Sequence, residues 1–113
     1  MFIEQIRYYV SDGNREDFIA ARREISDLRR QHGLPPGDIM LADTEDDGGP
    51  GVVWQCAYES EEDMSAISTR LIGNDAYEAA RQRLASLMER AEMELYTLDD
   101  DTDVVAETSE DGL

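Results

Sequence analysis

Three polar side chains alternate with apolar ones near the start of the chain, in the segment IEQIRYYV. Side chains alternate between the two faces of a β-strand, so Gln5, Arg7 and Tyr9 share one face of a strand predicted over residues 2–10. An amide, a guanidinium and a phenol each need a hydrogen-bond partner when they are buried. Their face is therefore a wet surface, a sealed structural network or the wall of a ligand pocket.

Two interpretations of Arg7 remain open from the sequence. Its planar fork of donors suits a ligand carboxylate or an enolate-like oxygen. A guanidinium inside a dimer also serves as a structural ion pair, with an acid on a neighbouring strand or on a partner subunit.

A later strand, predicted over residues 51–59, carries three larger side chains on one face: Trp54, Cys56 and Tyr58. If this face meets the same space as Arg7, then Trp54 and Tyr58 complete an aromatic pocket with a few convergent polar groups. If it faces the helices, these residues are core, and the cavity is lined by the alternate residues, Val53, Gln55 and Ala57. A shift of register by one residue exchanges the two faces.

The remaining chemical candidates predict no metal or nucleophilic site. His32, the only histidine, closes a helix and favours a capping role there; Cys56 is predicted to be a small buried side chain. The acids of the tail match some positions of a calcium loop, but Val104 stands where that loop requires glycine. The acidic stretch DTEDDGG also fails the pattern, so solvated acid is expected in both places.

The elements that position these residues follow from periodicity and turn signals. A first helix is predicted after SDGN, with Asn14 as N-cap and an apolar stripe from Phe18 to His32. A strand is expected over residues 38–43. A second helix is expected to begin after its N-cap, Ser60, and to break at GND. Asp75 and Glu78 are expected to cap its continuation, which runs to Ala91. The last strand is expected over residues 93–98.

This β-α-β-β-α-β order predicts an α+β, ferredoxin-like domain over residues 1–98, with a four-stranded antiparallel sheet and both helices on one face. The other face must still carry apolar side chains, either Trp54 or Val53 and either Leu95 or Tyr96. Because the chain has no third layer, we expect two copies to pair these sheet faces as a homodimer.

Composition restricts the setting of this domain. The formal charge is −17, with 27 acidic residues against ten basic ones, all arginine. Such a surface suits a cytoplasm that holds molar salt, where charge repulsion is screened within about 3 Å. It argues against nucleic acid and anionic membranes as partners. Residues 99–113 contain seven acids and no base and are predicted to be a disordered tail.

Two stretches resemble a known family. EQIRYYVSDGNREDF resembles the opening of NIPSNAP-type proteins, in which a strand with an amide or acid, an arginine and a tyrosine precedes a glycine and a helix with phenylalanine. WQCAYESEEDM and NDAYEAARQRLASLM are similar to that family's third strand and second helix. The resemblance covers residues 2–98 and implies the dimeric α/β-barrel superfamily, which includes cofactor-independent antibiotic-biosynthesis monooxygenases and haem-degrading enzymes.

The resemblance implies a homodimer whose paired sheets enclose a cavity lined by Gln5, Arg7 and Tyr9. Family haem handling relies on a histidine of the second helix, and this chain has none there, so no cofactor is expected. The first functional hypothesis is a cytoplasmic small-molecule-binding dimer, with Arg7 orienting an anionic or carbonyl oxygen of the ligand and Tyr9, Trp54 and Tyr58 stacking on it.

Two alternatives remain. The first is a cofactor-independent monooxygenase acting on an aromatic or polyketide-like substrate. It lacks an evident general base unless Glu4 or Glu94 points into the cavity. The second is a purely structural dimer with a filled barrel.

Overall fold

The computed structural model describes residues 1–42 and 49–99. The elements run in the order β1 (Phe2–Tyr9), a 3-10 turn η1 (Asp12–Asn14), α1 (Arg15–Gln31), β2 (Asp38–Leu41), β3 (Val52–Tyr58), α2 (Glu61–Leu71), α3 (Asp75–Leu87) and β4 (Arg90–Thr97). The acidic loop 43–48 and the predicted tail, apart from Asp99, lie outside the described residues.

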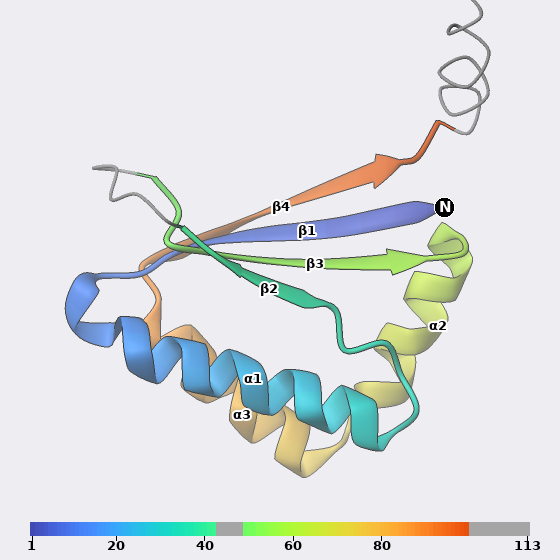
Figure 1. Cartoon of the computed structure of the whole chain (residues 1–113). Coiled ribbons are helices and arrows are strands. Elements are labelled where there is room, and N and C mark those ends of the chain that lie inside the picture. The colour runs from blue at the N-terminus through green and yellow to red at the C-terminus, as the bar shows by residue number, and fades with distance from the viewer. Residues whose placement is uncertain (43–48, 100–113) are drawn as a thin grey trace, which may run out of the picture.

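The strands form one antiparallel sheet in the order β2-β3-β1-β4. Figure 1 shows all three helices on the same side of this sheet, and no described element covers its other side. The predicted ferredoxin-like arrangement is therefore confirmed, with the second helix divided into α2 and α3. No helix in the described part of the chain has the length and apolar character needed to cross a membrane.

The two sheet faces have different surroundings, and we call them the helix face and the outer face. The core lies between the helix face and the helices, where Phe18, Ile25, Val52 and Leu71 are almost fully buried. Phe18 and Ile25 are two helical turns apart, so they belong to the predicted apolar stripe of α1.

Helix caps differ from the sequence prediction in two of three places. Ser60 caps α2 as predicted, accepting a hydrogen bond from the Asp63 backbone. Asn14 occupies the N-cap position of α1 as predicted, but its side chain makes no capping hydrogen bond there and donates instead to the Leu87 carbonyl at the end of α3. The α3 cap is Asn74 rather than Asp75, since the Asn74 side chain accepts from a backbone N–H in the first turn.

β4 begins earlier than predicted. The sequence pattern extended the preceding helix to Ala91, but α3 ends at Leu87 and β4 starts at Arg90. Residues 90–97 pair with β1 along its whole length. This tertiary pairing overrides the local helical propensity of the segment, and it brings Glu92 and Arg90 beside the polar residues of β1.

Candidate functional site

The five predicted ligand-contacting residues are divided between the two faces of the sheet. The register pairs Gln5 with Gln55 and Ile6 with Trp54, so Trp54 lies on the face opposite Gln5. Gln5, Arg7 and Tyr9 are on the outer face, whereas Trp54 and Tyr58 are buried on the helix face. The expectation that all five residues line one space is therefore wrong. The β1–β3 register places the two sets on opposite faces of the sheet, and a register shifted by one residue would have placed them on the same face.

The polar residues of β1 form a connected network on the outer face. Gln5 donates to the Gln55 side chain at 3.0 Å, and Arg7 donates to Gln5 at 3.4 Å. Arg7 also lies 3.5 Å from the carboxylate of Glu92 and 3.7 Å from that of Glu94, both on β4. Of the two interpretations of Arg7, the structure has the ion pair with acids on a neighbouring strand.

Tyr9 and Arg90 complete this outer-face network around Glu92. The Tyr9 hydroxyl donates to Glu92 at 2.8 Å, Arg90 pairs with the same carboxylate at 2.7 Å, and the Arg90 guanidinium lies 3.8 Å from the centre of the Tyr9 ring. The hydrogen bonds from Tyr9 and Arg90 lower the pKa of Glu92. Every predicted polar residue on this face thus has a partner within the chain.

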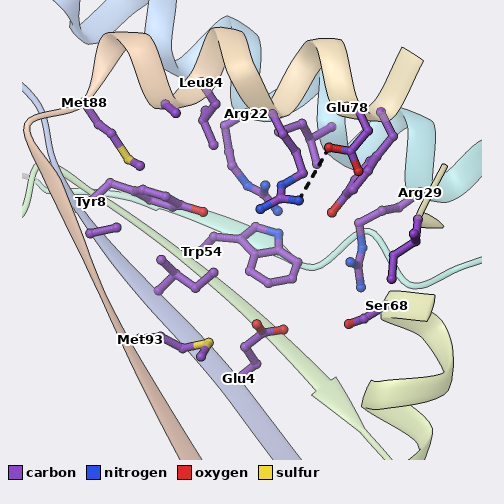
Figure 2. A pocket seen from close by; sticks show the side chains of 17 residues that line it. Glu4, Tyr8, Arg22, Arg29, Trp54, Ser68, Glu78, Leu84, Met88 and Met93 are labelled. Atoms are coloured by element: carbon purple, nitrogen blue, oxygen red, sulfur yellow. Dashed lines mark ion pairs between the residues drawn. The ribbon is translucent and has the colours of Figure 1, made fainter. Parts of the chain in front are cut away.

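A cavity of about 540 Å³ lies on the opposite side, between the helix face and the helices. Figure 2 shows side chains from the strands and the helices pointing into it. Its walls combine apolar and aromatic side chains with charged ones, which are Glu4, Arg22, Arg29, Glu78 and Arg81. A cleft of this size is typical of small-molecule sites, in which polar groups orient the ligand.

Trp54 forms a rigid wall of this cavity. Its indole N–H donates to the Pro36 carbonyl at 2.9 Å. Gly37 adopts a positive φ of 75°, and a methyl group there would overlap the indole. The guanidinium groups of Arg22 and Arg29 lie 4.2 and 5.0 Å from the centre of the indole ring. The loop after α1 and these two arginines therefore fix the indole in one orientation.

A hydrogen-bonded chain connects α1 to the cavity-facing carboxylate of Glu4. Arg29 donates to the Pro35 carbonyl at 2.7 Å and to the Tyr58 hydroxyl at 3.0 Å. Tyr58 in turn donates to Glu4 at 2.9 Å. Burial raises the pKa of Tyr58, so this phenol stays protonated and acts as a donor to Glu4. Tyr58 thus positions a carboxylate and does not itself line the cavity.

Arg22 differs from Arg29 in having no such partners. It is 4 % exposed, and its Nε has no hydrogen-bond partner among the residues that the structure describes. Burial lowers the pKa of Arg22 and raises that of the neighbouring Tyr8. Arginine nevertheless keeps its charge in proteins, so the cavity wall contains a buried cation.

The single histidine and cysteine have the structural roles predicted for them. His32 follows α1, where its Nδ1 lies 2.8 Å from the Leu28 carbonyl and its Nε2 lies 3.1 Å from the Asn74 side chain. Cys56 is buried on the helix face. Within residues 1–42 and 49–99 no group of histidine, cysteine and acidic side chains could hold a metal ion. The two acidic stretches tested for calcium lie largely outside those ranges.

The sequence prediction missed the cavity arginines, although their spacing was informative. Arg22 and Arg29 alternate with Phe18 and Ile25 at intervals of four, three and four residues, which places all of them on one face of α1. The sequence prediction described this helix face by its apolar residues and did not include the two arginines. The prediction allowed Glu4 or Glu94 as a base if either pointed into the cavity between paired sheets. Glu4 lies instead on the helix face and lines the cavity between the sheet and the helices, whereas Glu94 lies on the outer face beside Arg7.

Comparisons with solved structures identify the fold. Similar structures include a NIPSNAP family protein from Agrobacterium tumefaciens (21 % identity, TM-score 0.68, covering 88 % of this chain and 86 % of that one). An antibiotic biosynthesis monooxygenase is 12 % identical (TM-score 0.64, 88 % and 99 % covered), and a dimeric ferredoxin-like protein of unknown function from Thermobifida fusca is 14 % identical (TM-score 0.59, 87 % and 92 % covered).

No protein-family model and no curated protein matches the sequence. The resemblance predicted from the sequence is confirmed in the fold, since NIPSNAP and monooxygenase structures are among the neighbours. At these identities the likeness establishes architecture alone. The chain therefore has the ferredoxin-like α+β fold that NIPSNAP-type and antibiotic biosynthesis monooxygenase structures share.

Proposed function

We propose that this protein binds a small molecule in the cavity between the sheet and the helices. The observation that carries the proposal is the cavity itself, about 540 Å³ and bounded by the fixed indole of Trp54. Two of its lining residues, Ile72 and Met93, are 73 % and 56 % exposed, so they lie where the cavity opens to solvent. The cavity thus has an aromatic wall at Trp54 and an opening to solvent beside Ile72 and Met93, through which a ligand can enter.

Ligand-induced thermal stabilisation tests this proposal. Aromatic compounds that enter the cavity should raise the melting temperature, because a ligand that binds only the folded state stabilises it. Ala85→Trp, which adds bulk to the α3 wall of the cavity, should abolish the shift. Ala79→Trp, on the same helix but outside the cavity lining, is the matched control. Equal shifts in both variants would place the ligand elsewhere.

We further propose that two copies pair through their outer faces. That face is uncovered by any described element, and its exposed apolar side chains include Met40 and Tyr96, at 41 % and 46 %. The outer-face network of Gln5, Arg7 and Tyr9 would then lie at the subunit contact. A comparison structure with this fold is described as dimeric. Light scattering of the purified protein measures its molar mass and so tests whether it is a dimer.

A cofactor-independent monooxygenase is the second candidate, favoured by the position of Glu4. Its carboxylate lines the cavity and is held by Tyr58, so it can accept a proton from a bound phenol or activated methylene. The resulting carbanion would react with dioxygen: the methylene becomes a carbonyl, and the second oxygen atom leaves as water.

Oxygen consumption with the anthrone dithranol distinguishes enzyme from binder. An enzyme should consume oxygen at a rate that Glu4→Gln reduces by roughly 100-fold or more, while Glu89→Gln, in the turn before β4, keeps it. Glutamine can still accept the Tyr58 hydrogen bond, so the variant should fold. Stabilisation by ligands without oxygen uptake would support the binder alone.

A further inference from the structure

The chemistry of Arg22 in the cavity wall points to a particular class of ligand. Arg22 comes from α1, and Figure 2 shows its guanidinium above the Trp54 indole, with Glu4 on the far side of the indole in that view. The guanidinium carbon is 4.2 Å from the centre of the indole ring. Arg22 is 4 % exposed and lines the cavity wall.

The other arginines of the cavity are neutralised or hydrogen-bonded within the chain. Arg29 has the Pro35 carbonyl and the Tyr58 hydroxyl, and Arg81 pairs with Glu78 at 3.8 Å. Arg22 has no carboxylate within ion-pairing distance in the described ranges, and its Nε is unpartnered. A buried charge without a counter-ion is unfavourable unless something supplies one.

We infer that the ligand is an aromatic anion that carries a hydroxyl group, with its carboxylate or enolate oxygen at Arg22 and its hydroxyl at Glu4. The inference rests on the proposed function, because it names the ligand class of the same cavity. An anionic oxygen at the Arg22 guanidinium supplies the missing counter-ion.

The Glu4 carboxylate selects a donor at the other end of the ligand. One oxygen of Glu4 accepts from Tyr58 at 2.9 Å, and a carboxylate can accept further hydrogen bonds through its second oxygen. A ligand carboxylate beside Glu4 would be repelled, whereas a hydroxyl would donate to it. Between the two ends, Ile6, Trp54 and Leu84 provide apolar and aromatic contacts for a ring system.

Three related probes test this ligand class at about 1 M KCl, where long-range repulsion by the acidic surface is screened. They are hydroxynaphthoate, its neutral carboxamide, and naphthoate without the hydroxyl. Hydroxynaphthoate should bind about ten-fold or more tightly than either of the others, since each loses one hydrogen bond to a charged group. This comparison uses the unaltered protein, so no variant has to fold.

Substitutions then test whether Arg22 causes the preference for the acid over the carboxamide. Arg22→Met should reduce the preference for the acid over the carboxamide to about one-fold, while Arg83→Met should leave it unchanged. Arg83 is an exposed α3 arginine that pairs with Glu24 outside the cavity. Retention of the full preference in Arg22→Met would overturn the assignment of the anionic group to this residue.

The outcomes separate the two proposals. If the carboxamide binds as tightly as the acid and Ala85→Trp blocks both, the cavity is a binding site but the inferred ligand class is wrong. If naphthoate binds as tightly as hydroxynaphthoate, the assignment of Glu4 fails. If none of the probes binds, the proposed function fails and the inference fails with it.

Discussion

Replacing Arg22 by methionine should make the ligand-free protein more stable. Arg22 is 4 % exposed, its Nε has no partner among the described residues, and burial lowers its pKa. Each of these observations indicates that its charge destabilises the folded chain. Methionine keeps an unbranched apolar stem of similar length and removes the charge, so the packing against Trp54 can persist.

The size of the effect follows from two opposing contributions. Desolvation of an ion in a protein interior costs several kcal/mol after relaxation. The contact with the Trp54 ring at 4.2 Å offsets about 2 kcal/mol of this. The remaining imbalance predicts a gain of about 1 kcal/mol in the free energy of unfolding for Arg22→Met. In a domain of this size that corresponds to roughly 4–8 °C in melting temperature.

Arg29→Met is the matched comparison, because Arg29 lies on the same helix face, has the same burial and contacts the same indole. Its removal leaves the Pro35 carbonyl and the Tyr58 hydroxyl without their donor. Buried groups left unsatisfied cost about 1–3 kcal/mol each, so this variant should be destabilised by about 3 kcal/mol. Urea denaturation at constant, high KCl measures both variants against the unaltered chain.

Whether Arg22→Met raises or lowers the free energy of unfolding distinguishes a ligand-binding role of Arg22 from a structural one. Stabilisation would mean that Arg22 is retained for ligand recognition at the expense of stability, a common relation between function and stability. A loss of about 3 kcal/mol, equal to that of Arg29→Met, would show that Arg22 is a structural residue whose charge is compensated without a ligand. The inferred anion site would then lose its main support.

Three further predictions concern the surface and the outer face. Melting temperature should rise from dilute buffer to about 1 M KCl, because screening reduces the repulsion of a chain with net charge −17; a flat or falling curve would refute salt adaptation. Because its partners lower the Glu92 pKa from the usual 4.5, Glu92 contributes stability that is present above pH 4.5 and lost as the pH falls through the lower folded value. Tyr9→Phe should move the Glu92 carboxyl midpoint up toward 4.5 in an NMR titration, and an unchanged midpoint would contradict the assigned cause. Arg7→Leu should weaken the proposed dimer in light scattering yet leave hydroxynaphthoate affinity unchanged, whereas a parallel loss of binding would mean that the partner subunit contributes to the site.

The fold was predictable because its signals are local and redundant. The stripe of α1 containing Phe18 and Ile25, the Ser60 cap and the turn clusters each indicate the same element order. The failures occurred where tertiary contacts decide. Pairing with β1 converts residues 90–91 from predicted helix into strand, and the Asn14 side chain bonds to the end of α3 instead of to the first turn of its own helix.

The candidate site was predictable only in part, because a strand pattern does not say which face meets the helices. The alternation that groups Gln5 with Arg7 and Trp54 with Tyr58 is confirmed, but the register places the two groups on opposite sides of the sheet. Trp54 and Tyr58 therefore belong to the helix face and not to the predicted cavity between paired sheets. The charge of Arg7 is neutralised by Glu92 and Glu94, and the anion-binding role predicted for Arg7 is proposed instead for Arg22 on α1.

The burial of Arg22 and Arg29 also bears on how an acidic protein can recognise an anion. Salt at about 1 M screens exposed charges over about 3 Å, so surface ion pairs give little recognition under such conditions. A guanidinium enclosed between α1 and the indole of Trp54 is screened much less, because ions and water have limited access to it. Arginine also stacks on aromatic rings and keeps its charge when buried, as lysine does not. Anion selectivity in this cavity should therefore persist at salt concentrations that abolish the repulsion from the acidic surface.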